Sequence, residues 1–527
     1  MRQKAAPGLS RDNCIDSTIN SELLSLLLPT SPGTPMSVLK PACTSLALLF
    51  TVAASAIEPS YQPFPKGYGY LEPAETRALQ AAVKQGDNAV VRAHGWRLWA
   101  GIMQPAAGLD WPVWYTWPNT SDAFASKPIS ASAEVGDTKM GSAPKRRMGR
   151  LGASTLPPVN LPDTPAYIVP AQVIKAYPNA IVSTIDGGKT KLSIRDGIHF
   201  AFNGDIMIAT ESLSKEALDF IRDPKQPVYQ KSTLDALYSK DDPDKRVHNL
   251  NAPASYVVTK HMYWPVKAKG LSALPVWHND FSASYPGYAG YEKWHTLAAI
   301  DPSGKQVGKI AQVSYLHGVF RHDATTPWPT ITKAARIYGL QDFYHHQVSQ
   351  ADWDSFDEAD KAIINAASYW LNGQPFGAGD FLVTVAMHIN TKEIPSWGLQ
   401  SVWWSDIPDS MPYAANRPAN PQAKGPWKHY LLTEAYGIPE KGNPELLPVA
   451  TNPYIELVTH PVATSCYTCH ANAGWPSSFQ AMTPGVTSYQ NPACPNLRAA
   501  LNPESSCLAP FTLTDFQWII PDRAVNQ

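Results

Sequence analysis

The sequence predicts an α+β fold, in which a body of mixed or antiparallel sheet carries few helices, long irregular loops and a coil-rich C-terminal segment. Strand-length runs with alternating or continuous apolar character recur from about residue 164. The 49 Pro and 32 Gly, with 17 Trp, 23 Tyr and 15 Phe, indicate a loop-rich globular protein and not a helical bundle. After about residue 440 the chain becomes rich in Pro, Asn and Thr, which is typical of coil.

Length and charge limit the classes of protein that the chain can represent. The 527 residues suffice for about two or three domains. The formal net charge of −1 provides no global field to attract nucleic acid or an anionic membrane. The chain contains no H-E-x-x-H, G-x-S-x-G, P-loop or G-x-G-x-x-G motif, and its 14 histidines are scattered without tight metal spacing.

The N-terminus has the pattern of a processed leader. Met36–Lys40 is a short basic region, Leu46–Ala54 is an apolar run, and Ala54-Ser55-Ala56 is an A-x-A cleavage site. We therefore interpret residues 36–56 as a signal peptide and residues 1–35 as an upstream extension from a misassigned start codon. A retained membrane anchor is the alternative, but the apolar run is short for a span. The sequence predicts export to the bacterial periplasm, with no stable membrane insertion after cleavage.

The mature chain divides into three predicted regions. They are an aromatic-rich region and linker (57–160), the α+β body (161–440) and the C-terminal segment (441–527). Pro73–Lys84 is predicted to be a helix with Pro73 in its first turn. The Trp-rich stretches His94–Trp99 and Trp111–Trp117 fit packing in an irregular core, or else stacking on a substrate or on a porphyrin edge.

Strands dominate the predicted body. The expected strands are Ser193–Phe202, Ile206–Thr210, Tyr256–Lys267, Leu274–Trp277, Trp294–Asp301 and Phe381–His388. The first two are expected to form a hairpin through a turn at Asn203–Asp205, and the later ones to continue one sheet. Ser214 is expected to cap a helix over Lys215–Arg222, and Ser355-Phe-Asp-Glu358 is a capping box that opens a helix ending at Gly373.

One motif near the C-terminus indicates a cofactor. Cys466-Tyr-Thr-Cys469-His470 has the form C-x-x-C-H, the attachment site of a c-type haem. The two thiols add to the porphyrin vinyl groups, and the adjacent histidine reaches the iron. Half of a zinc knuckle, a thioredoxin-like dithiol and a structural disulfide are the competing interpretations. The chain shows neither a second ligand pair at metal spacing nor a βαβ context for the motif. No second C-x-x-C-H occurs, so the sequence predicts one covalent haem c, held by the segment 441–527.

The remaining cysteines suggest one disulfide. Of the six cysteines, Cys14 and Cys43 lie in the part predicted to be removed, and two belong to the haem motif. Cys494 and Cys507 are left, and an oxidising compartment favours a disulfide between them. Two free thiols are the alternative.

The sixth ligand of the iron decides whether the haem only passes electrons or also binds a small molecule. Met482 is the only methionine after the motif, although its path from His470 around a porphyrin edge is short. His388 is the second candidate, because Thr384 and Ala386 on its predicted strand face are small enough to leave room for a flat ring. A core histidine is the alternative for His388, and an open sixth position is the third possibility.

Several stretches resemble the bacterial "cytochrome c family proteins", a group of exported single-haem proteins. They are Asn203–Ala209, Trp264–Lys267, Leu274–Trp277, Ala386–Pro395 with Trp397, and Trp403-Trp404, together with the C-terminal C-x-x-C-H. The resemblance covers most of the mature chain from about residue 90. It implies a periplasmic haem protein with a large non-haem body, and it implies no particular substrate. Lys392, within the fourth stretch, is expected to be solvated or else to meet a haem propionate.

Two classes of function follow from these patterns. The first is an electron-transfer protein whose body docks a redox partner protein or reacts with a small molecule. The alternative is a haem-dependent oxidoreductase of peroxidase or oxygenase type, whose α+β body forms a substrate pocket. A ligand-binding or sensing module is a third class. Because no acid–base constellation is visible in the sequence, electron transfer is the first expectation, and no catalytic residue, electron donor or oligomeric state is assigned.

Overall fold

A computed structural model describes the residues on which the fold can be discussed. They are 60–109, 111–125, 166–186, 189–195, 208–278, 291, 294–321, 325–418, 426–457, 466–476 and 505–526. All of them belong to one compact unit that spans residues 54–527. The predicted upstream extension and signal peptide, Met482 and Cys494 lie outside the described residues.

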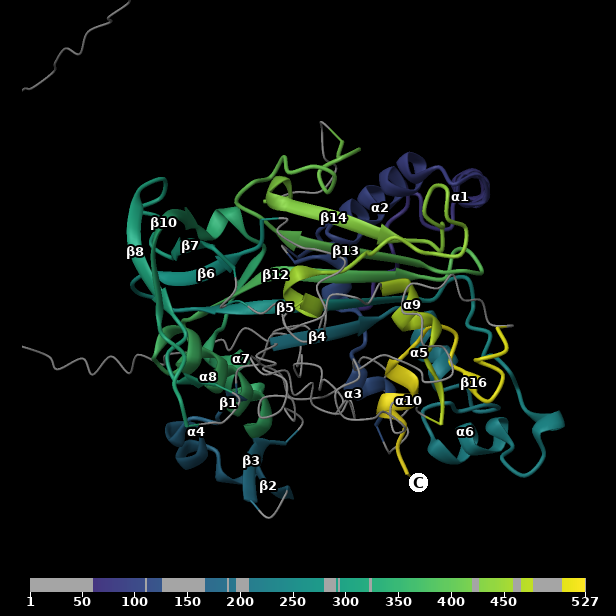
Figure 1. Ribbon diagram of the computed structural model, residues 1–527, viewed down its shortest axis with the longest axis horizontal. Coiled ribbons are helices and arrows are strands. Elements are labelled where there is room, and N and C mark those ends of the chain that lie inside the picture. The colour runs from purple at the N-terminus through teal and green to yellow at the C-terminus, as the bar shows by residue number, and fades with distance from the viewer. Residues whose placement is uncertain are drawn as a thin grey trace, which may run out of the picture. The chain divides into compact units, whose positions relative to one another are not determined.

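A six-stranded antiparallel sheet is the centre of the fold (Figure 1). Its order is β14-β13-β12-β5-β4, and β11 also pairs with β12. The strands are β4 (Ile208–Leu213), β5 (Val257–Val266), β11 (His345–Gln347), β12 (Phe381–Thr391), β13 (Gly398–Trp404) and β14 (Tyr430–Ala435). The predicted strands Tyr256–Lys267 and Phe381–His388 therefore form, and they are direct neighbours in the middle of this sheet.

A separate four-stranded sheet takes the segments that were expected to continue the first one. Its order is β6-β7-β10-β8, with a parallel pair between β7 and β10. The strands are β6 (Ser272–Val276), β7 (Thr296–Asp301), β8 (Ile310–Tyr315) and β10 (Ile331–Gly339). The prediction of a single sheet was wrong because strand character alone does not specify which strands pair. The mixed sheets and few helices confirm the α+β class.

Three two-stranded sheets complete the described strands. They pair β1 (Ala166–Tyr167) with β9 (Val319–Phe320), β2 (Ile181–Asp186) with β3 (Lys189–Ile194), and β15 (Gly474–Trp475) with β16 (Thr512–Leu513). The predicted turn at Asn203–Asp205 and most of the hairpin between 193–202 and 206–210 lie outside the described residues. Strand β3 ends at Ile194 and pairs with the preceding β2, whereas β4 pairs with β5.

The helices are mostly short, and several of their ends follow the predicted signals. They are α1 (Pro73–Gln85), α2 (Asn88–Ile102), α3 (Thr120–Ala123), α4 (Ala171–Ala176), α5 (Lys215–Ile221), α6 (Lys231–Tyr238), α7 (Gln350–Ser355), α8 (Glu358–Asn372), α9 (Cys466–Ala471) and α10 (Ile519–Arg523). Pro73 opens α1, the Ser214 side chain caps α5, and Gly373 ends α8 in the left-handed conformation at φ 66°. Within the part of the chain described here, no helix is long and apolar enough to span a bilayer.

The capping-box prediction for α8 needs a correction. Ser355 is the last residue of α7, and the cap of α8 is Asp357, whose side chain accepts a hydrogen bond from the Asp360 backbone N–H at 2.9 Å. The predicted helix therefore starts two residues later. Two adjacent capping sequences compete here, and the carboxylate nearer to the helix caps it.

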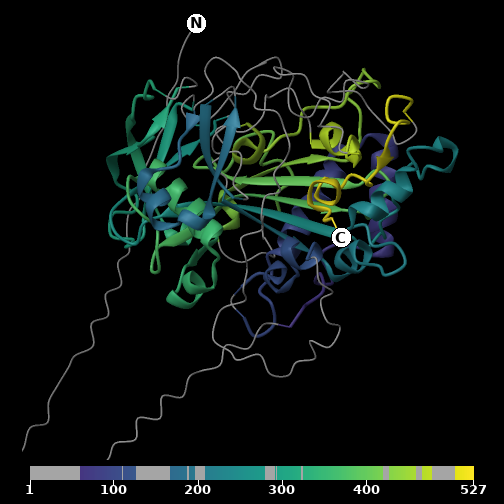
Figure 2. The same cartoon turned by 90° about the horizontal axis from the view of Figure 1, so that it is seen from below.

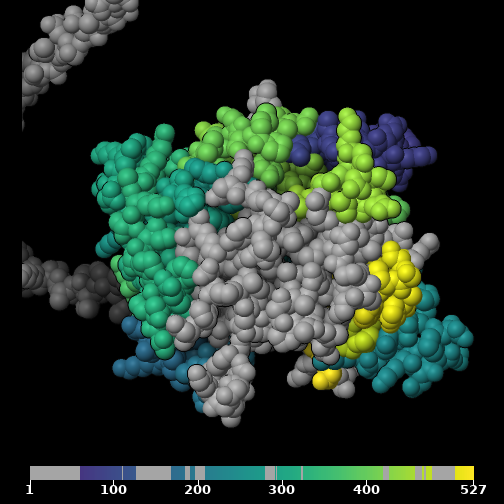
Figure 3. Space-filling model, in the orientation of Figure 1, coloured from purple at the N-terminus to yellow at the C-terminus, as the bar shows by residue number. Residues whose placement is uncertain are grey.

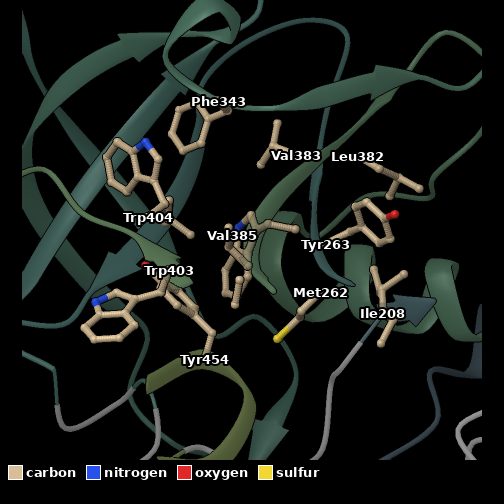
Figure 4. Close-up of a cluster of buried hydrophobic side chains, with 14 of the residues drawn as sticks. Ile208, Met262, Tyr263, Phe343, Leu382, Val383, Val385, Trp403, Trp404 and Tyr454 are labelled. Atoms are coloured by element: carbon tan, nitrogen blue, oxygen red, sulfur yellow. The ribbon is translucent and has the colours of Figure 1, made fainter. Parts of the chain in front are cut away.

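The aromatic stretches belong to the core. Trp96 and Trp99 of α2 are fully buried, and Trp114 and Trp117 are almost so. Figure 4 shows part of this core, where Trp403, Trp404, Phe343 and Tyr454 gather around β12. The core-packing interpretation of the Trp clusters is thus confirmed for these side chains.

A second hydrophobic cluster joins the three predicted regions. It contains Ala123 from the first region, Tyr256 and Trp397 from the body, and Tyr467 and Phe516 from the C-terminal segment. The C-terminal segment therefore packs on the body and shares its core. In Figures 1 and 2 its short helices, drawn in yellow-green and yellow, lie against the six-stranded sheet. In Figure 3 its last residues, in yellow, border the teal region that holds α6, in agreement with the contacts of α6 with β15 and β16.

The two faces of the six-stranded sheet carry different covers. Helix α2 lies on one face, where Gly95 approaches the side chains of Gln400 and Leu432 so closely that a Cβ at residue 95 would lie 3.3 Å from Gln400. The opposite face carries His388 and meets the short π-helix Pro453–Leu457 (η8), which contacts β12. Helix α2 and η8 therefore lie on opposite faces of the sheet, while Val91 of α2 and Tyr467 of α9 line one pocket beside the end of β14.

Candidate functional site

Three rows of side chains cross the sheet on the face that carries His388. Residues directly opposed in antiparallel strands present their side chains on the same face. The middle row is polar and consists of Glu211, Lys260, His388, Ser401 and Thr433. The flanking rows are mostly apolar, and they consist of Ala209, Met262, Ala386, Trp403 and Leu431 on one side and Leu213, Val258, Asn390, Leu399 and Ala435 on the other. His388 thus lies at the centre of a polar line within an apolar surface.

A β-bulge next to this row changes one predicted neighbour of His388. The pairing of β12 with β5 shifts between Thr384 and Ala386, so that Thr384 opposes Tyr263 and Ala386 opposes Met262. Tyr263 and Met262 are adjacent in β5 and point to opposite faces. Ala386 therefore shares the face of His388 as predicted, but Thr384 does not, because the extra residue of the bulge inverts the alternation.

The C-x-x-C-H motif forms the short helix α9, and its prediction as coil was wrong. Cys466 donates its backbone N–H to the Ala450 carbonyl at 2.8 Å, which ties the start of α9 to the chain before η8. Tyr467 is buried against Phe516, with ring centroids 5.1 Å apart, and against Gly437, where a Cβ would lie 2.9 Å from the Tyr467 ring. Positions 466 and 469 are one helical turn apart, and His470 follows at once.

His470 is oriented by the end of the chain. Its Nδ1 lies 2.7 Å from the Phe516 carbonyl oxygen, which accepts a hydrogen bond from the ring N–H. This bond fixes the tautomer in which Nδ1 carries the proton and Nε2 keeps its lone pair. Withdrawal from water lowers the pKa of His470 to about 4, so the ring is neutral at ordinary pH. A neutral imidazole with Nδ1 bound to a carbonyl is the form in which histidine ligates a metal through Nε2.

The loop that supplies the Phe516 carbonyl is held by a buried carboxylate. Asp515 is 2% exposed and accepts hydrogen bonds from Lys392 Nζ at 2.7 Å, from Trp397 Nε1 at 3.0 Å and from the Ala252 backbone N–H at 2.8 Å. Asp515 and Phe516 both have positive φ, 51° and 66°, which turns the chain sharply at this point. The expectation of a solvated Lys392 was wrong, because its side chain is only 14% exposed and forms an ion pair with Asp515.

The structure brings His388 and His470 into the same environment. The charge of His388 is among the causes that lower the pKa of His470, together with that of Lys260, whereas Glu456 acts in the opposite direction. Glu456 belongs to η8, and its Oε1 lies 3.0 Å from Nε2 of His388. The two histidines predicted as ligands therefore lie close enough for the charge of His388 to affect His470.

A buried asparagine positions η8 over the polar row. Asn452 donates its side-chain N–H to the Ser401 hydroxyl at 2.8 Å and to the Val402 carbonyl at 3.0 Å. Its backbone N–H donates to the Glu456 carboxylate. Glu456 was not predicted, and neither was the Phe516 carbonyl, because both are set by tertiary contacts that no local pattern encodes.

The other predicted site residues are less informative. Cys466 is half-buried in α9, and the side chain of Cys469 lies outside the described residues. Met482 and Cys494 also lie outside them, so ligation by Met482 and the Cys494–Cys507 disulfide stay predictions. Among the described side chains, no group of three or more His, Cys, Asp and Glu residues is arranged to hold a metal ion on its own.

The residues present fit a haem held by C-x-x-C-H. His470 offers the lone pair of Nε2, and the flanking rows supply apolar surface for a porphyrin. Nε2 of His388 is buried and has no hydrogen-bond partner among the described residues, although Glu456 is near it. An orphaned buried nitrogen costs free energy unless a ligand satisfies it.

Comparisons with protein-family models, curated proteins and solved structures find no match for the chain.

Proposed function

We propose that this protein is an exported single-haem c-type cytochrome of the periplasm that transfers electrons. The observation that carries the proposal is the orientation of His470, whose Nδ1 donates to the Phe516 carbonyl and leaves Nε2 for iron, in a helix that begins at Cys466. A bound haem c supplies reversible one-electron chemistry.

Each residue has a defined part in this proposal. Cys466 and Cys469 attach the porphyrin, and His470 is the proximal ligand. Asp515 holds the loop that orients His470, and Lys392 neutralises the charge of Asp515. The large α+β body excludes water from the cofactor and presents a surface to a redox partner, which is a protein or a small molecule. The net charge of −1 gives no support for a nucleic-acid partner.

Covalent attachment is the first test. The full chain, expressed with its leader in a bacterium that matures c-type cytochromes, is expected to carry one haem that stays bound in denaturing electrophoresis. The double variant Cys466→Ala/Cys469→Ala is expected to lose it, whereas the control Cys507→Ala keeps it. A wild-type protein without covalent haem would contradict the proposal, as would retention in the double variant.

The same preparation separates electron transfer from the alternative, a haem-dependent oxidoreductase. A carrier has two strong axial ligands, so its ferrous haem is low-spin and does not bind carbon monoxide. A high-spin ferrous haem that binds carbon monoxide would favour the enzyme, with His388 and Glu456 as the nearest acid–base pair to the site. The visible spectrum with and without carbon monoxide is the measurement.

A further inference from the structure

We propose that His388 is the second axial ligand of the haem iron, opposite His470, and that Glu456 positions it. This inference rests on the proposed function, since it requires the covalent haem, but it makes a separate claim about the sixth coordination position. Three features of the described residues support it.

The first feature is the path of the chain between α9 and His388. The Ala450 carbonyl accepts the backbone N–H of Cys466, the first residue of α9. Two residues later, Asn452 donates to Ser401, which is the cross-strand partner of His388. Two residues of extended chain span at most about 7 Å. Short connections through the backbone and the Asn452 side chain therefore link the start of the haem-attachment helix to the strand next to His388.

The second feature is the state of the His388 ring. Its side chain is 12% exposed, and its Nε2 is fully enclosed without a hydrogen bond from the described residues. Oε1 of Glu456 lies 3.0 Å from this nitrogen but off the direction in which it could form a hydrogen bond. Burial of an imidazole nitrogen without a hydrogen bond costs free energy, and coordination to a metal removes that cost.

The third feature is the surface around the ring. Ala386, two residues before His388 on the same face, has a small side chain, and Met262 and Trp403 flank it. All three are almost completely buried. On the other side of the polar row, Tyr467 of the motif belongs to the cluster that contains Leu399 and Val258. A flat apolar ring bound at His388 would thus contact hydrophobic side chains on both sides, which favours its burial.

Glu456 has the position of an orienting residue. Its carboxylate accepts the backbone N–H of Asn452, which itself bonds to β13. A carboxylate fixed in this way beside an imidazole restricts the rotation of the ring, as carboxylates beside metal-ligating histidines do. Glu456 does not touch the iron in this arrangement, and it acts through His388.

Ligation by two imidazoles has a consequence for function. Two strong ligands leave no position for a small molecule, and a second imidazole gives a lower reduction potential than a methionine thioether in the same place. The site would then serve electron transfer at low potential, and Met482 would not ligate the iron.

The test compares four variants of the haem-loaded full-length protein. His388→Ala is expected to convert the low-spin haem to a high-spin form that binds carbon monoxide, and added imidazole is expected to restore the low-spin spectrum. His345→Ala, a control on the neighbouring strand β11 of the same sheet, and Met482→Ala are both expected to keep the wild-type spectrum. Glu456→Gln is expected to stay low-spin with an altered reduction potential. All variants should retain covalent haem.

The wild-type protein gives a result that does not depend on how any variant folds. Its electron paramagnetic resonance spectrum should have the signature of a low-spin haem with two imidazole ligands. A histidine–methionine or high-spin signature would overturn the inference while leaving the proposed cytochrome intact. Conversion by Met482→Ala, or an unchanged spectrum in His388→Ala, would also overturn it. A wild-type protein without covalent haem would instead contradict the proposed function itself.

Discussion

Lys392→Met is expected to destabilise the folded protein by about 3 kcal/mol, because it removes the cation from a buried carboxylate. Asp515 is 2% exposed and would keep only two neutral donors, Trp397 Nε1 and the Ala252 N–H. Removing one member of a buried ion pair costs about 3–5 kcal/mol. The two remaining hydrogen bonds place the expected loss at the lower end of this range. The methionine side chain retains most of the apolar volume of the lysine stem, so loss of packing contributes little.

The chain offers a matched control for this prediction. Lys245 pairs with Asp242 at 2.7 Å, the same distance as the Lys392–Asp515 pair, but its side chain is 80% exposed. An exposed pair contributes at most about 1 kcal/mol, so Lys245→Met should lose much less than Lys392→Met. Urea unfolding of the full-length protein, with the slopes compared, measures both losses. The double variant Lys392→Met/Asp515→Asn should recover part of the stability. Equal losses in the two single lysine variants would refute the reasoning.

Two further predictions concern α10 and α9. Burial raises the pKa of Asp522 from 3.8 to about 7, so the native state holds a proton that the unfolded chain releases. The contribution of Asp522 to stability should therefore be complete below about pH 4 and fall by up to about 1.4 kcal/mol per pH unit as the pH rises to about 7. In urea unfolding at several pH values, Asp522→Asn should make this decline shallower, while Glu434, whose pKa burial also raises to about 7, keeps a part of it. Gly437→Ala places a Cβ 2.9 Å from the Tyr467 ring at a φ of 73°, whereas Gly442→Ala has a similar φ of 85° but open space around its Cβ. Gly437→Ala should therefore lower the thermal midpoint clearly more than Gly442→Ala. Equal shifts of the midpoint would argue against the Tyr467 contact.

Local signals predicted local structure well. Pro73 and Ser214 mark the starts of α1 and α5, and Gly373 marks the end of α8, because capping depends on a few neighbouring residues. The long apolar run from Phe381 predicted β12 correctly. These elements are determined by propensities that act within about one turn or a few strand positions.

Features that depend on which strands pair were not predicted from the sequence. Strands β6 and β7 have the composition of the main sheet but pair in another one, since register and partner are tertiary choices. The bulge at Thr384 follows a regular alternation that gives no sign of an extra residue. The C-x-x-C-H motif is too short and too closely flanked by proline-rich chain to predict α9 as a helix.

The sequence predicted candidate ligands, which stay predictions, but not the residues that hold them in place. The cysteine spacing indicated attachment at Cys466 and Cys469, and the strand pattern put His388 on a face with Ala386. That this face is the one that α9 approaches is a property of the tertiary fold. No sequence pattern marked Glu456 or the Phe516 carbonyl as part of the site. A glutamate in predicted coil is common, and every residue has a backbone carbonyl.

Residues near the C-terminus are anchored on residues near position 250. This arrangement affects the order in which the site is completed during synthesis. The Leu513 backbone N–H donates to the His248 carbonyl, and the Leu250 N–H donates to the Leu513 carbonyl. A chain that emerges from its N-terminus can thus pair all strands around His388 before residues 505–526 exist to dock. The Phe516 carbonyl that orients His470 is thus made after every strand of the six-stranded sheet, so the tautomer of His470 is fixed only when the last residues of the chain have docked.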